Sequence, residues 1–208
     1  MAERLVLDLF CEDSGHEVFI TNLVRVIARL LAVTEPLVKP ISARGGHGKA
    51  ISELKAWQRG LRSGSLVRGD AQLVVIDANS KGWRAMDRDV RAAIDSSLYP
   101  QVLIGCTDPH VEVWCAADPA AFQSQFSVAV PPAPSRSGRL VYKQWLRTAL
   151  EQEGVVVLGD PMDISLDLLP AMDLNRACQW FQALRTMSPS PALHQPMAIL
   201  RGSVPAPP

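Results

Sequence analysis

The sequence predicts an α/β protein, with a doubly wound parallel sheet that carries helices on both faces. Short apolar segments alternate with segments of helical periodicity through the first half of the chain, which is typical of βαβ units. Residues 71–76 (AQLVVI) form an unbroken apolar run, as expected for a parallel strand that is covered on both sides. Acidic residues follow directly after the apparent strands, where such folds bind ligands.

The individual elements follow from local patterns. Strands are expected at residues 4–11, 37–43, 71–76 and 101–106, and helices at about 14–33, 49–62 and 83–98. Asp8 is an unexpected acid inside the first strand, and Pro40 places the second strand near an edge of the sheet. Ser14 is the expected N-cap of the first helix, because Glu17 three residues later completes a capping box.

The second half of the chain has weaker patterns. A proline- and serine-rich loop at residues 130–138 suggests a boundary, and amphipathic helices are expected at about 139–153 and 171–187. The predicted organisation is an α/β domain at 1–130, a helical extension at 131–187, and a disordered or surface-draped tail at 188–208.

The composition excludes several classes of protein. The 208 residues include 21 basic and 21 acidic side chains, so no global positive field attracts nucleic acid or anionic lipid. Four scattered cysteines form no C-x-x-C pair, which disfavours a zinc site. The sequence shows no signal peptide and no apolar run long enough to span a membrane. A cytoplasmic protein with no membrane partner is expected.

Three acids lie just past apparent strand ends, namely Glu12, Asp77 and Asp108. Carboxylates at neighbouring strand ends repel one another unless a positive charge lies between them. Hard oxygen ligands in a small cluster suit Mg²⁺ or Mn²⁺, which can bind phosphate and activate water. The alternative is that strand-end acids cap the following helices, which suits Asp13 well.

Two nucleotide-binding motifs are disfavoured. The loop after the first strand, CEDSGHE, contains one glycine, whereas a dinucleotide site needs a glycine-rich turn. The stretch ARGGHGKA has alanine at the first glycine and at the last hydroxyl position of a P-loop. A basic loop near the site is expected instead, with Arg44 and Lys49 binding phosphate. Lys81, shortly after Asp77, is a further candidate, although a solvated loop lysine is the simpler interpretation.

The layout resembles that of response-regulator receiver domains. These also have acids after the first strand and a phospho-acceptor aspartate after the third, which LVVIDANSKG resembles at Asp77. Thr107 falls near the fourth strand end. However, no lysine–proline strand end follows, and the chain is too long for a bare receiver.

Three segments resemble the TOPRIM superfamily, the metal-binding domain of topoisomerases, primases and OLD-family nucleases. FCEDSGHEVFITNLV is similar to its first motif, with Glu12 as the glutamate, and VVIDANSKG is similar to its D-x-D motif, with Asn79 at the second aspartate. DPHVEVWCAADPAAF (108–122) resembles a segment of small stand-alone bacterial TOPRIM-like proteins. The matching positions there are Pro109, Glu112, Trp114, Ala117, Asp118, Pro119 and Ala121.

The TOPRIM resemblance implies a Rossmann-like sheet and a Mg²⁺- or Mn²⁺-dependent nuclease acting on DNA or RNA. Glu12, Asp77 and Glu112 would be the catalytic metal ligands, with Asn79 in support. It further implies an ABC-type or SMC-like ATPase partner and a role in antiviral defence. The alternative is a non-catalytic binding or assembly module, which Asn79 and the neutral net charge favour.

Two histidines are candidate proton shuttles. His16 lies near Glu12 and His110 lies near Glu112. A histidine placed like His16 is more commonly a surface residue. A histidine placed like His110 is more commonly a loop residue without a role. Trp83 and Trp114 are expected to pack in the core or at its rim.

Overall fold

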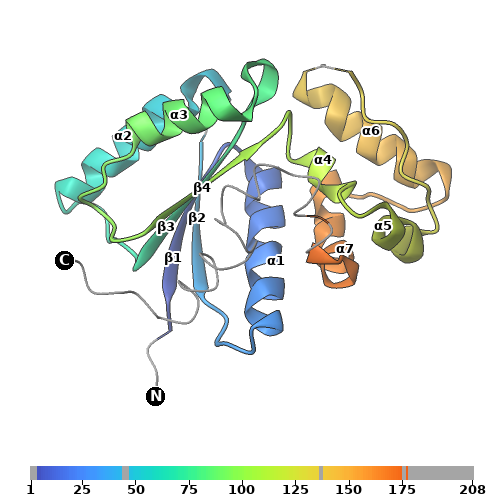
Figure 1. Ribbon diagram of the computed structural model, residues 1–208, viewed down its shortest axis with the longest axis horizontal. Helices are drawn as coiled ribbons and strands as arrows, with labels where there is room; N and C mark the ends of the chain where they lie inside the picture. The colour runs from blue at the N-terminus through green and yellow to red at the C-terminus, as the bar shows by residue number, and fades with distance from the viewer. Residues whose placement is uncertain (1–3, 44–46, 136–137, 175–176, 178–208) are drawn as a thin grey trace.

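Four parallel strands form a sheet in the order β2-β1-β3-β4 (Figure 1). This computed structural model describes residues 4–43, 47–135, 138–174 and 177. The strands are β1 (Val6–Cys11), β2 (Leu37–Ser42), β3 (Ala71–Asp77) and β4 (Val102–Thr107). The predicted α/β class, with a parallel sheet flanked by helices, is confirmed.

Strand β3 lies inside the sheet, and all of its residues are buried. Val74 pairs in register with Phe10 of β1 on one side and with Ile104 of β4 on the other. Its apolar run is unbroken because both faces of the sheet are covered. Pro40 lies in β2 at the edge, as predicted, because proline has no N–H to donate to a central ladder.

Helices cover both faces of the sheet (Figure 1). Helices α2 (His47–Arg62) and α3 (Trp83–Ala93) lie on one face, and α1 (Ser14–Leu30) lies on the other. Alternate residues of β3 therefore enter two different apolar clusters. Val74 and Ile76 face α2 and α3, whereas Leu73 and Val75 face α1.

The second half of the chain packs on the α1 side of the sheet. Its elements are α4 (Glu112–Cys115), α5 (Pro119–Phe126), α6 (Arg139–Gln152), η2 (Pro161–Ile164) and α7 (Ser165–Ala171). Leu150, Met162 and Leu168 belong to the same buried cluster as Leu9 and Phe19. The described part of the predicted extension thus completes the core of the α/β unit.

The ends of two helices differ from the prediction. Asp13 caps α1 in place of Ser14, because its Oδ1 accepts from the His16 N–H at 2.9 Å and Ser14 is already helical. Helix α3 stops at Ala93 instead of residue 98. The Gln58 amide there donates to the Ala93 carbonyl at 2.9 Å and accepts from the Asp95 N–H at 2.6 Å.

Helix α7 was not predicted, because it is short and contains Pro170. Most of the predicted helix at 171–187 and the whole predicted tail at 188–208 lie outside the described residues.

The unexpected acid in β1 has a structural explanation. Asp8 is buried, and its Oδ2 accepts hydrogen bonds from the Tyr99 hydroxyl at 2.6 Å and from the Gly69 N–H at 2.5 Å. It therefore joins β1 to the segments that precede β3 and β4. Among the described residues, no helix combines the length and apolarity needed to cross a membrane.

Candidate functional site

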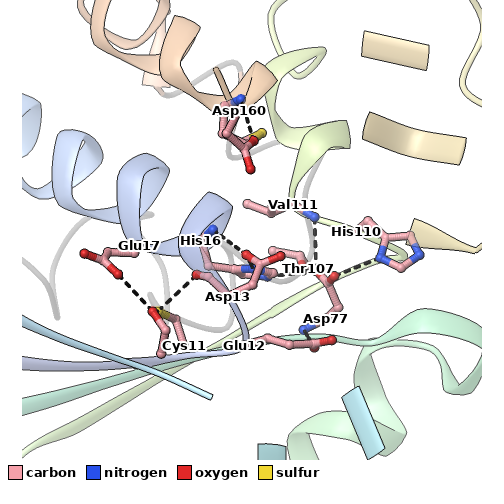
Figure 2. Close-up of polar contacts among 12 residues, drawn as sticks. Cys11, Glu12, Asp13, His16, Glu17, Asp77, Thr107, His110, Val111 and Asp160 are labelled. Carbon is pink, nitrogen blue, oxygen red and sulfur yellow. Dashed lines mark hydrogen bonds and ion pairs between the residues drawn. The ribbon is translucent and has the colours of Figure 1, made fainter. Parts of the chain in front are cut away.

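The carboxyl edge of the sheet holds a buried polar network (Figure 2). Asp77 is the last residue of β3, Thr107 is the last residue of β4, and Glu12 follows β1. All three are buried. The expectation that strand ends bring these residues to one edge is confirmed, because parallel strands point the same way.

Asp77 accepts hydrogen bonds from four residues. Its Oδ1 lies 2.8 Å from His16 Nε2 and 3.1 Å from the Val111 N–H, and it also accepts from the Thr107 hydroxyl. Its Oδ2 lies 2.8 Å from His110 Nδ1. Burial alone would raise the pKa of Asp77, but the charge of His16 and these hydrogen bonds hold it well below its usual range.

His16 lies between two carboxylates. Its Nδ1 is 2.8 Å from Asp13 Oδ1, and its Nε2 is 2.8 Å from Asp77 Oδ1. Both nitrogens can donate only when the ring is an imidazolium. Burial opposes this charge, but Asp77 and Asp13 outweigh it and raise the pKa of His16 to about 10. A surface position, the more common one for such a histidine, is therefore wrong here, and His16 is a buried cation.

Glu12 contacts the same network through the backbone. Its Oε2 accepts from the Asp77 N–H at 3.2 Å, so the side chain bridges the ends of β1 and β3. The neighbouring thiol does not add a nucleophile. Burial raises the pKa of Cys11 to about 12, which keeps it protonated at neutral pH.

Glu112 differs from the other buried carboxylates of the site. It begins helix α4 and is 1% exposed, yet neither of its carboxylate oxygens has a hydrogen-bond partner among the described residues. Burial and the negative charge of Asp77 raise its pKa to about 7, against the opposing effects of its own backbone N–H, His16 and Lys143. A buried carboxylate without a hydrogen-bond partner is costly while it is charged, which is why burial favours its protonated form.

Some residues of the segment 108–122 contact the site, and others stabilise the fold. His110 contacts Asp77, and Glu112 lies close enough for the charges of Asp77 and His16 to shift its pKa. Asp108 accepts from the Trp83 N–H at 3.0 Å, which fixes the start of α3. Trp114 packs in the core against Phe19, with ring centroids 5.9 Å apart, as predicted.

Asn79 stabilises the turn after β3. Its φ of 50° is left-handed, a conformation that asparagine tolerates better than most residues. Its Nδ2 donates to the Asp77 carbonyl at 3.3 Å, and its N–H donates to the Pro109 carbonyl at 3.0 Å. The amide donor, which an aspartate would lack, gives a structural reason for asparagine at this position.

The residues predicted to bind phosphate are not gathered at Asp77. Lys49 is exposed in the first turn of α2, and Lys81 is exposed and pairs with Asp89 at 3.0 Å. Arg44 lies outside the described residues. The basic side chain beside the network is Lys143 of α6, which pairs with Asp160. No sequence pattern indicated this pair, because it comes from the distant second half of the chain.

No protein-family model, curated protein or solved structure matches this chain. The fold and the site geometry therefore define it only as an α/β protein with a buried histidine–carboxylate network at the carboxyl edge of a parallel sheet.

The side-chain oxygen and nitrogen atoms of the site can be compared with the ligands that Mg²⁺ or Mn²⁺ requires. Within the described part of the chain, no three His, Cys, Asp or Glu side chains converge to form a complete metal site. Mg²⁺, however, is commonly held by one or two carboxylates together with substrate phosphates and water. The unpartnered oxygens of Glu112 fit that requirement, whereas those of Asp77 are already bonded to four residues.

Proposed function

We propose that this protein hydrolyses phosphodiester bonds of nucleic acid with the help of a Mg²⁺ or Mn²⁺ ion. The observation that supports the proposal is the buried carboxylate of Glu112, which has no hydrogen-bond partner among the described residues. A cation would offset its charge and remove the cost of burying it. The resemblance to TOPRIM proteins supports the same site, with Glu12 and Asp77 on the same sheet edge.

Glu112 would hold the ion, and Asp77 would be a second ligand if it exchanges a histidine contact. Glu12, which accepts from the Asp77 N–H, would support Asp77 at the same sheet edge. When bound, such an ion lowers the pKa of water and stabilises negative charge on phosphate oxygens. Glu112 at the start of α4 would place this chemistry beside His16 and His110.

The two histidines would have different roles. At neutral pH, His16 keeps its proton because its pKa is about 10, so it supplies a fixed positive charge and not a base. The ring of His110 is oriented by Asp77, whose Oδ2 accepts from Nδ1 when that nitrogen carries the proton. We assign His110 the role of the residue that moves a proton, because a carboxylate fixes its tautomer.

The test combines metal binding with cleavage. Mn²⁺ should raise the melting temperature of the wild type by mass action, and Glu112→Gln should abolish most of that shift. Cleavage of plasmid, single-stranded DNA and tRNA should fall by about 10²-fold or more in Glu112→Gln. Glu153→Gln, which removes the same charge from an exposed site, is the control. Equal Mn²⁺ shifts in all three proteins would rule out the metal site.

A specific observation favours the second candidate, a non-catalytic binding or assembly module. Asp77 accepts hydrogen bonds from four residues, so it has a structural role without any metal. The same experiment separates the two functions. Assays should include the predicted ATPase partner where one is encoded beside this protein. Persistent lack of cleavage together with assembly of the complex would support the module.

A further inference from the structure

A groove of about 990 Å³ lies along helix α6. Its lining includes Leu140 and Trp145 of α6 and continues to Asp160, which precedes η2, and to Pro161, the first residue of η2. Lys143 also lines it, so the groove joins an apolar wall to a positive charge. That combination suits a ligand with a flat or apolar part and an anionic group.

The ammonium group of Lys143 lies next to the buried network. It pairs with Asp160 Oδ2. A Cβ atom added to Gly15, in the first turn of α1, would lie 3.5 Å from Lys143 Nζ and 3.3 Å from Asp13 Oδ1. The groove therefore approaches the same helix turn that carries His16.

The Lys143–Asp160 pair can exchange partners. The Lys143 side chain is 17% exposed and that of Asp160 is 23% exposed, so both can be reached from the groove. Asp160 Oδ1 separately accepts from the Met162 N–H at 3.0 Å, which caps η2. If Lys143 leaves, Asp160 keeps this second bond and the local backbone keeps its anchor.

The wall of the groove is also held independently of Lys143. Arg147 donates to the carbonyls of Val157 at 2.9 Å and Gly159 at 2.7 Å. These bonds fix the segment that leads into Asp160. Lys143 can thus change its partner while the shape of the groove is kept.

We propose that Lys143 binds a phosphate group of the substrate in this groove and that Asp160 holds the lysine when the groove is empty. The proposal rests on the proposed function in naming a phosphodiester as the ligand. A phosphodiester carries one negative charge and two free acceptor oxygens, as the Asp160 carboxylate does, so it can replace Asp160 as the partner of the ammonium group. Lys143 is close enough to Glu112 to lower the pKa of that carboxyl, which relates the groove to the site where hydrolysis is proposed.

Inorganic phosphate is the probe, titrated by calorimetry into the full chain at constant ionic strength without metal. Lys143→Gln should weaken binding at least tenfold, and Lys143→Arg should restore most of it. Asp160→Asn should strengthen binding several-fold, because it removes the competing charge while the asparagine oxygen can still cap η2. Lys55→Gln, which removes the same charge from an exposed position on α2, should bind like the wild type.

The outcomes are separable from those of the nuclease test. A purely structural ion pair would lower the melting temperature in both Lys143→Gln and Asp160→Asn without changing phosphate affinity, and this would overturn the proposal. Absence of phosphate binding by the wild type would also overturn it. Cleavage with an unchanged KM in Lys143→Gln would refute the phosphate site alone. Lys143-dependent phosphate binding without any cleavage would refute the nuclease alone.

Discussion

At the scale of single residues, the buried carboxylates differ in what offsets their charge. Asp77 has the His16 imidazolium and three further donor residues, whereas Glu112 has no hydrogen-bond partner among the described residues. The contribution of His16 to stability is complete below about pH 6.5 and is lost as the pH rises through about 10. That of Asp77 is present above about pH 3.8 and is lost as the pH falls.

The ionisation of Glu112 makes the stability of the protein depend on pH in the opposite direction to that of Asp77. Its carboxyl holds a proton up to about pH 7 in the folded protein but only to about 4.5 in the unfolded chain. The folded state therefore binds more protons in this window, and the free energy of unfolding falls as pH rises from 4.5 to 7. In metal-free buffer at pH 8, Glu112→Gln should be more stable than the wild type by about 3 kcal/mol.

Urea unfolding at pH 5 and pH 8, with chelator present, measures this difference. The stability gain of Glu112→Gln should fall below about 1 kcal/mol at pH 5, because that pH is only slightly above the ordinary pKa of the carboxyl in the unfolded chain. Glu153→Gln should show no comparable pH-dependent gain. A variant less stable than the wild type at pH 8 would mean that the carboxylate tethers the structure.

At the scale of elements, the sheet is joined to its crossovers by side chains that accept backbone hydrogen bonds. Asp8 of β1 does this for the segment before β3, where its Oδ2 accepts from the Gly69 N–H. The close approach requires glycine. A Cβ added to Gly69 would lie 2.8 Å from the Val6 carbonyl oxygen and 3.0 Å from the Asp8 carboxylate.

Gly69→Ala should accordingly destabilise the protein by about 1–3 kcal/mol, because a backbone atom of β1 must move to admit the methyl group. Thermal and urea unfolding would measure the loss. Gly138→Ala is the matched control, since a Cβ added there meets no atom within 4 Å. Comparable losses in the two variants would indicate a general backbone effect and would exclude crowding at Gly69.

At the scale of the whole molecule, the second half of the chain is part of the main core. Helix α7 packs against α1, and its Leu168 is 0% exposed within the cluster that includes Phe19. Leu166 on the same helix is 61% exposed. Removing a buried contact in α7 should therefore weaken the whole α/β unit.

Leu168→Ala should lower the free energy of unfolding by about 2–5 kcal/mol. The loss should occur in one cooperative transition that fluorescence and circular dichroism report together. Leu166→Ala should stay within about 0.5 kcal/mol of the wild type. Two separate transitions in Leu168→Ala would show that residues 131–174 unfold independently of the sheet.

Local patterns in the sequence were sufficient to predict the strands and the sheet edge that holds the site. The apolar run at 71–76 predicts β3, and the parallel alternation places Glu12 and Asp77 at the same edge. These predictions succeed because burial of a strand on both faces and the direction of parallel strands depend on residues close in the chain.

Only the tertiary structure decided how the charges of the site are offset. His16 meets Asp77 across 61 positions of sequence, and the pairing turns an expected surface histidine into a buried cation. Lys143 and Asp160 reach the same region from the second half of the chain. The protonation state of a buried group depends on every charge within a few ångströms, and those neighbours are set by packing between distant segments, which no local pattern records.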